Sequence, residues 1–138
     1  MTAFACKACG TVVTADLTEV AFPADAPGDE PPVPRLDRGT FALDPDPFGP
    51  PSEPSPDNPQ IHVWAGPRET VLIHPEDARN LRRHRDRSRL NGCCDLDGLD
   101  GPNLVCGNCG AELATERSDC WVTWHDVRLQ PEAVTRDG

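Results

Sequence analysis

Large apolar and aromatic side chains are scarce in this sequence. Apolar residues make up 37% of its 138 residues, aromatic residues make up 5%, and Tyr is absent. So few large side chains exclude a large packed core, and a small core needs a further source of stability. Long hydrophobic runs are also missing, because the longest aliphatic run, residues 71–73, cannot span a bilayer. We therefore expect no membrane-spanning segment.

Positive charge is the second shortage. Lys7 is the only lysine, and 13 basic side chains face 23 acidic ones, which gives a formal net charge of −10. This charge disfavours the whole chain as a nonspecific binder of nucleic acids or anionic membranes. Residues 1–10 also lack the apolar core of a signal peptide. We therefore expect a cytoplasmic protein in a reducing environment, where paired cysteines are more often metal ligands or redox groups than disulfides.

Cysteine, by contrast, is abundant, and four of the seven cysteines form two Cys-x-x-Cys-Gly units. The first unit contains Cys6 and Cys9, and the second contains Cys106 and Cys109. Two residues between thiolates allow a tight turn that directs both sulfurs at one ion, and two such turns supply the ligands of a closed tetrahedral zinc site. Sulfur-only ligation favours Zn²⁺, although it also suits iron. We expect one structural Zn²⁺ here; a redox Cys-x-x-Cys pair and two separate metal sites are the alternatives.

The two units are unusually far apart. Residues 10–105, which are 96 residues, separate them, whereas simple zinc ribbons have about 15–20 residues at this point. Each doubling of a loop costs only about 0.6 kcal/mol, and a structural zinc site contributes about 10 kcal/mol or more. The ion therefore outweighs the added loop entropy and joins the two ends of the chain.

The paired units resemble the zinc-ribbon group over residues 1–22 and 104–129. This resemblance implies that each metal-binding turn, or knuckle, lies at the tip of a β-hairpin. A second stretch, which runs from Gly92-Cys93-Cys94 to residues 119–121, resembles small actinobacterial proteins. The second resemblance implies no activity.

Three cysteines, Cys93, Cys94 and Cys120, lie outside the two units. Adjacent cysteines point apart in extended backbone, and a straight strand over residues 120–129 places Cys120 and His125 on opposite faces. We therefore expect these thiols to be buried as small hydrophobic groups. A second metal site or a reactive thiol, with His125 as a base for Cys93 or Cys94, remains an alternative. A second metal ion would take its fourth ligand from His62, His74 or His125.

Arginine is concentrated in residues 79–89, where it takes six of eleven positions. Pro75, followed by two acidic residues, predicts the first turn of a surface helix that extends to about residue 88. Arginines four residues apart repel each other on a helix, so an anion is expected to offset them. We expect the acidic segment 23–59 to supply this anion, with a phosphate backbone as the alternative. The candidate anion-binding residues are Arg82, Arg83, Arg85, Arg87 and Arg89.

Proline is concentrated in residues 23–59, where it takes 12 of 37 positions. Because proline lacks the backbone N–H, this segment is expected to form neither a helix nor an inner strand. We predict an irregular Pro/Asp-rich insertion that is anchored by Phe41, Leu43 and Phe48.

Apolar and β-branched stretches predict the strands, at residues 11–22, 61–64, 70–73, 111–115 and 120–129. The polar tail after Pro131 predicts a frayed end. We therefore predict one small zinc-stabilised domain over residues 1–138, of the α+β class and mostly β. In it, a zinc-ribbon-like pair of knuckles joins the N- and C-terminal hairpins, with one surface helix and the irregular insertion. Its core candidates include Trp64, Trp121 and Trp124.

The expected function is that of a binding or adaptor module for a protein partner, with structural zinc and no catalysis. One alternative is nucleic-acid binding through the arginines of residues 79–89. The other is a thiol enzyme or redox sensor that uses Cys93, Cys94 or Cys120.

Overall fold

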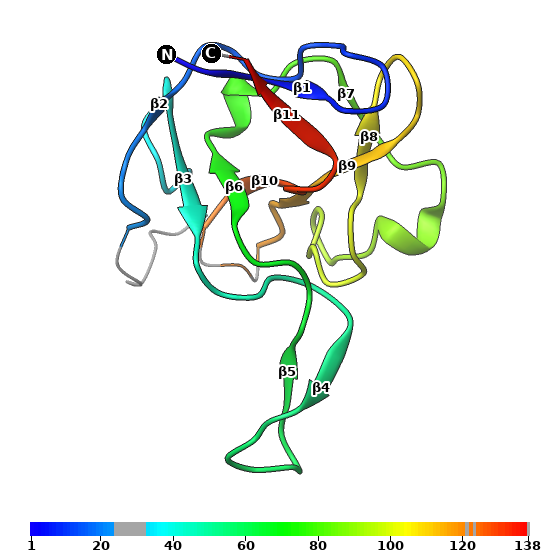
Figure 1. Cartoon of the computed structure of the whole chain (residues 1–138). Helices are drawn as coiled ribbons and strands as arrows, with labels where there is room; N and C mark the ends of the chain where they lie inside the picture. Colours follow the sequence, from blue (N-terminus) through cyan, green and yellow to red (C-terminus); the bar gives the residue numbers. More distant parts are fainter. Residues whose placement is uncertain (24–32, 121, 123, 138) are drawn as a thin grey trace.

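The computed structural model describes residues 1–23, 33–120, 122 and 124–137. Within these residues the largest sheet has seven strands in the order β2-β3-β6-β10-β9-β8-β7, and β1-β11 and β4-β5 form two-stranded sheets (Figure 1). The strands are β1 (Ala3–Cys6), β2 (Thr18–Glu19), β3 (Thr40–Asp44), β4 (Ser52–Pro54), β5 (His62–Trp64), β6 (Thr70–Ile73), β7 (Leu81–Arg83), β8 (Leu104–Cys106), β9 (Glu112–Arg117), β10 (Asp126–Leu129) and β11 (Val134–Asp137). Two short 3₁₀ helices are η1 (Pro75–Asp77) and η2 (Arg87–Arg89).

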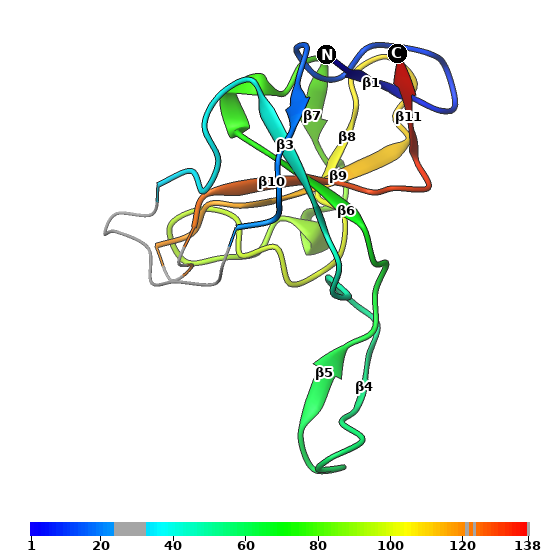
Figure 2. The same cartoon turned by 60° about the vertical axis from the view of Figure 1, so that its left-hand side comes forward.

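The two ends of the chain pair with each other. Strands β1 and β11 are antiparallel, with Cys6 opposite Val134, and both termini lie at the same end of the molecule (Figures 1 and 2). The predicted frayed end after Pro131 is wrong, because β11 gains hydrogen bonds from β1 and buries Val134. None of the described helices is long and apolar enough to cross a membrane.

The main core lies where β1 and β11 meet the large sheet. Phe4 on β1 packs edge-to-face on Phe41 of β3, with ring centroids 5.1 Å apart. The same cluster contains Val134 of β11 and the first cysteine of each knuckle, Cys6 and Cys106. The core is thus small, and it includes one side of the cysteine site.

Strand β3 lies inside the predicted irregular insertion and is an inner strand between β2 and β6. The expectation that this segment lacks an inner strand is wrong at Thr40–Asp44. The reason is local, since residues 35–44 contain no proline and keep every backbone N–H. Phe41 and Phe48 are buried and Leu43 is half-buried, as their predicted role as anchors requires.

The rest of the predicted insertion contributes a hairpin. Strands β4 and β5 pair with each other and extend away from the body of the protein (Figures 1 and 2). At the base of the hairpin, the ring of Trp64 lies 4.7 Å from that of Phe48. Trp64 and Trp124 are half-buried, and Trp121 lies outside the described residues.

The predicted helix over residues 75–88 is wrong beyond its first turn. Pro75 begins η1, and the His74 ring accepts the N–H of Glu76, but the helix ends at Asp77. Asn80 has a positive φ of 57° and β7 follows directly. Repulsion between arginines weakens a helix here, while pairing of β7 with β8 supplies backbone hydrogen bonds. The arginine-rich segment is therefore a strand at the sheet edge followed by a 3₁₀ turn.

Other predicted strands are confirmed in part. Strand β6 covers the predicted residues 70–73, β5 and β9 overlap their predictions, and β8 has no counterpart among the predicted strands. Over residues 11–22 the structure has isolated bridges and the short β2. Among the described residues of the predicted strand 120–129, the strand covers Asp126–Leu129.

Candidate metal centre

The first knuckle closes a β-hairpin at the end of β1. The N–H of Cys6 donates to the carbonyl of Thr11 at 2.8 Å, and the N–H of Gly10 donates back to the carbonyl of Cys6 at 2.7 Å. An antiparallel bridge between Ala5 and Val12 continues the hairpin. The chain therefore reverses within the four residues that follow Cys6, and the turn carries Cys9.

The second knuckle repeats this geometry at the end of β8. The N–H of Cys106 donates to the carbonyl of Ala111 at 2.8 Å, and the N–H of Gly110 donates to the carbonyl of Cys106 at 2.9 Å. Gly10 and Gly110 have φ values of 81° and 80°, in the left-handed region that favours glycine. Both knuckles thus lie at hairpin tips, as the resemblance to zinc ribbons implies.

The knuckles face each other, and their four sulfurs form one cluster. The Sγ atoms of Cys6 and Cys109 lie 3.6 Å apart, and those of Cys9 and Cys106 lie 3.7 Å apart. All four sulfurs are within 4.8 Å of one another. A tetrahedral ion with metal–sulfur bonds of about 2.3 Å requires sulfurs about 3.8 Å apart. Two sulfur–sulfur distances already match this edge, and the described cluster could hold a metal ion.

The two cysteines of each knuckle differ in burial. Cys6 and Cys106, the first of each pair, are buried in the core cluster, while Cys9 and Cys109 are exposed. A bound ion would therefore contact the core on one side and solvent-facing turns on the other.

Backbone and side-chain donors surround the exposed sulfurs. The Thr11 hydroxyl, 3.1 Å from the Cys9 sulfur, and the Thr11 N–H lower the pKa of Cys9 to about 6. The Ala111 N–H acts in the same direction on Cys109, but burial and the neighbouring thiols outweigh it and raise the pKa of Cys109 to about 12. The two exposed thiols of the cluster therefore differ in acidity, because hydrogen-bond donors dominate at Cys9 and burial with neighbouring thiols dominates at Cys109.

Cys93, Cys94 and Cys120 form a second cluster. Their sulfurs also lie within 4.8 Å of one another, and all three residues are exposed. The expected burial of these thiols is therefore wrong. Leu96 of the same loop is buried instead, with 2% of its surface exposed.

Asp119 organises the second cluster, and sequence reasoning missed it. Its carboxylate accepts the backbone N–H groups of Cys93, Cys94 and Cys120 at 2.8, 2.8 and 2.7 Å. The three N–H donors, that of Cys93 first, lower the pKa of Asp119 to about 2. The only sequence signal is its position directly before Cys120, since aspartate side chains commonly accept nearby backbone N–H groups.

The histidines proposed as further ligands do not join this cluster in the described part of the chain. The Nε2 atom of His125 lies 2.9 Å from a carboxylate oxygen of Glu116, and this hydrogen bond raises the pKa of His125. His74 caps η1 through its Nδ1 atom, and His62 lies on the projecting hairpin. The second cluster therefore consists of three thiols.

The arginines of residues 79–89 find their described partners outside the insertion. Arg83 pairs with Asp95 at 2.8 Å, and Arg89 pairs with Glu112 at 2.9 Å. The described part of residues 23–59 provides no ion pair for these arginines, so it does not neutralise them as expected. Within the described residues, four of these arginines form no ion pair: Arg79, Arg82, Arg85 and Arg87.

Two hairpin-tip knuckles that share one cluster of four sulfurs are consistent with a zinc-ribbon-like pair. Here the pair joins the N-terminal and C-terminal parts of one mostly β chain. Comparisons of the chain with models of protein families, with curated proteins and with solved structures give no match. The resemblance to zinc ribbons therefore rests on the knuckles and their hairpins.

Proposed function

We propose that the chain is a zinc-stabilised binding module with one structural Zn²⁺. The proposal rests on the sulfur cluster, in which opposite knuckles approach to 3.6 and 3.7 Å, close to the edge of a zinc tetrathiolate. Four protein sulfurs leave no position for substrate, which is typical of a structural rather than a catalytic zinc ion. Its ligands are Cys6, Cys9, Cys106 and Cys109.

The small core of this fold favours a structural role for the zinc ion. The apolar core is small, and the ligands come from two distant parts of the chain, so the ion closes a loop of 96 residues. A structural zinc site adds about 10 kcal/mol or more to folding, which is comparable with the whole stability of a small domain. Zinc binding and folding are therefore expected to be one coupled event.

Metal analysis and one ligand variant test this proposal. Cys9→Ser should lose the ion and most of the cooperative unfolding transition, because one thiolate is replaced by a poor zinc ligand. Ala8→Ser is the matched control, since Ala8 is exposed in the same turn and offers no ligand in the native chain. Zinc content and thermal unfolding are measured for both variants. A zinc content in Cys9→Ser equal to that of Ala8→Ser would overturn the tetrathiolate assignment.

We assign the binding role to the projecting β4-β5 hairpin. Ile61 and Val63 expose 56% and 40% of their surface there, and both strands have a free edge within the described residues. Apolar side chains on a protruding hairpin suit a protein partner that adds a strand or covers the exposed face. We expect that the Val63→Asp variant no longer recovers the partner proteins that bind the wild type. Its zinc content and its unfolding transition should stay unchanged. Equal recovery with wild type and Val63→Asp would remove the hairpin from this role.

Nucleic-acid binding at the β7 edge is the second candidate. Arg82, Arg83 and Arg85 line a surface groove of about 350 Å³ together with residues 108–110 of the second knuckle. A groove lined by arginines suits a phosphate chain, although the net charge of −10 opposes it. The wild type should bind a single-stranded oligonucleotide with an affinity that falls steeply as the salt concentration rises. The double variant Arg82→Glu, Arg85→Glu should abolish this binding. If no salt-dependent binding is measured for the wild type, this candidate is excluded.

A further inference from the structure

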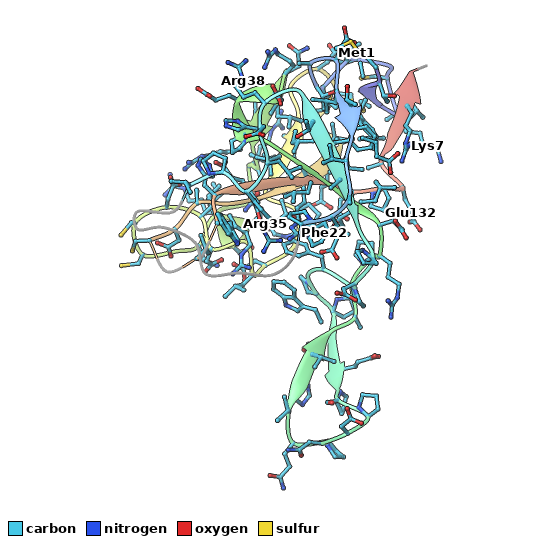
Figure 3. The ribbon with its side chains drawn as sticks, turned by 90° about the vertical axis from the view of Figure 1, so that its left-hand side faces the viewer. Met1, Lys7, Phe22, Arg35, Arg38 and Glu132 are labelled. Carbon is cyan, nitrogen blue, oxygen red and sulfur yellow. The ribbon has the colours of Figure 1, made fainter. Side chains whose placement is uncertain are left out.

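Cys93, Cys94 and Cys120 differ from the first cluster in exposure and in ligand number. Their sulfurs lie within 4.8 Å of one another although they come from two segments, the loop after η2 and the turn after β9. All three are free thiols and all three are exposed. Sulfur-bearing side chains are visible at the left-hand edge of the molecule in Figure 3, far from the labelled Lys7 of the first knuckle.

Hydrogen bonds to the buried Asp119 hold the backbone of this cluster in place. Each cysteine donates its own N–H to the carboxylate of Asp119, and Asp119 itself is 2% exposed. The N–H of Asp119 donates to the carbonyl of the buried Leu96 at 2.9 Å. One buried carboxylate therefore holds three thiol-bearing residues in one orientation, with their sulfurs on the solvent side.

Adjacent cysteines point apart in extended backbone, and the turn at Gly92 allows Cys93 and Cys94 to bind the same ion. Gly92 has a φ of 151°, and a Cβ at this position would lie 1.7 Å from the carbonyl oxygen of Asp95. This close approach bends the backbone at residues 92–95 sharply enough for both Cys93 and Cys94 to face Cys120. The glycine is required here by space as well as by conformation.

We propose that Cys93, Cys94 and Cys120 bind a second Zn²⁺ ion, with one coordination position open to an external ligand. Three sulfur ligands select a thiophilic metal, and zinc sites with three protein ligands keep a fourth position for water or another molecule. This site is independent of the structural ion. Because it is exposed and one ligand short, its ion exchanges faster than the ion of the closed site and can accept a thiolate or imidazole from a small molecule or a partner.

The wild-type protein provides a direct test. Full-length protein freed of metal under reducing conditions is loaded with excess Zn²⁺, treated with iodoacetamide, and mapped by peptide mass spectrometry. Zinc should protect the three cysteines from alkylation by at least about tenfold, since metal-bound thiolates are poorer nucleophiles than free ones. Cys6 and Cys9 are monitored in the same digest and report separately on the structural site. Equal alkylation of Cys93, Cys94 and Cys120 with and without zinc overturns the proposal, whatever the first site does.

Counting bound ions provides the second test. Native mass spectrometry should find two zinc ions in the wild type and one in Cys120→Ser. Leu99→Ser is the matched control, because Leu99 lies in the same loop, is 51% exposed and should retain two ions. A chromophoric chelator of moderate affinity should remove one ion quickly from the wild type and none quickly from Cys120→Ser. A wild type that saturates with one ion, or a Cys94–Cys120 disulfide that forms in place of metal binding, overturns the second site.

Discussion

Gly10 and Gly110 occupy the same position in two separate knuckles and have φ values of 81° and 80°. Each donates its N–H to the carbonyl of the first cysteine in its knuckle. No atom lies within 4 Å of the position of a Cβ at either glycine. Glycine is therefore required at these positions for its left-handed backbone conformation and not for lack of space around a Cβ atom.

Substitution of Gly110 tests this separation. Gly110→Ala should destabilise the zinc-loaded protein by about 1–2 kcal/mol, the cost of a left-handed conformation for a residue with a side chain. Gly110→Asn should cost less, because asparagine tolerates this region. Urea unfolding at saturating zinc measures both variants. Equal losses for alanine and asparagine would contradict the conformational explanation.

A buried ion pair attaches β3 to the core of the sheet. Arg128 on β10 donates to the carboxylate of Asp44 at the end of β3, and both residues are buried. The Arg128 guanidinium also lies 4.2 Å from the ring centroid of Phe48. Asp44→Ala should destabilise the fold by about 3–5 kcal/mol, because it leaves the buried Arg128 with only its longer ion pair to Asp126 at 3.9 Å.

The neighbouring Asp46 provides the control for this prediction. Asp46 is exposed, and its backbone N–H donates to Asp44, so Asp46→Ala keeps the contact and should change stability by less than about 0.5 kcal/mol. Urea unfolding of both variants gives the comparison. Similar effects for the two substitutions would show that the ion pair does not stabilise the position of β3.

The clearest predictable features are those set by short-range geometry. Two cysteines with two residues between them, followed by glycine, specify a tight turn, so the knuckles and their pairing follow from the sequence. The helix predicted over residues 75–88 does not form beyond its first turn, because its helix propensity is weak and pairing of β7 with β8 supplies competing hydrogen bonds. The same long-range effect turns the polar tail into β11, which forms only because β1 lies beside it.

Composition also misled the interpretation of two segments. Proline density over residues 23–59 predicts irregular structure, but the density is uneven, and the proline-free residues 35–44 contain the inner strand β3. Cysteine is among the most buried residue types, so burial was expected for Cys93, Cys94 and Cys120. Three backbone hydrogen bonds to Asp119, which no spacing rule specifies, hold these thiols at the surface instead.

The contact between His125 and Glu116 predicts a dependence of stability on pH. The carboxylate accepts a hydrogen bond from the imidazolium and raises the pKa of His125 above its ordinary value of 6.5. The protonated form is therefore favoured more in the folded than in the unfolded protein. The resulting stabilisation is fully present below pH 6.5 and is lost as the pH rises through the folded pKa.

Glu116→Gln should remove this dependence, because the neutral amide lacks the charge that favours the imidazolium. NMR titration of the His125 ring should then give a pKa lower than that of the wild type, and the stability loss above pH 6.5 should shrink. Glu132→Gln is the control, since Glu132 is exposed and has no described ion pair. An unchanged His125 titration in Glu116→Gln would contradict the assigned cause.

The Asp119 carboxylate should set the affinity of the three-cysteine site without contacting the ion. Asp119→Asn retains the shape but replaces one acceptor oxygen with an amide that must face backbone N–H donors. Loss of such an outer contact typically lowers metal affinity about 10–100-fold, and the same loss is expected for the second zinc ion by competition with a chromophoric chelator. Asp97→Asn is the control, because the Asp97 carboxylate in the same loop accepts the N–H of Leu99 and none from the cysteines. Retention of wild-type affinity in Asp119→Asn would show that the cysteines converge without the carboxylate, whereas loss in both variants would indicate a general loosening of the loop.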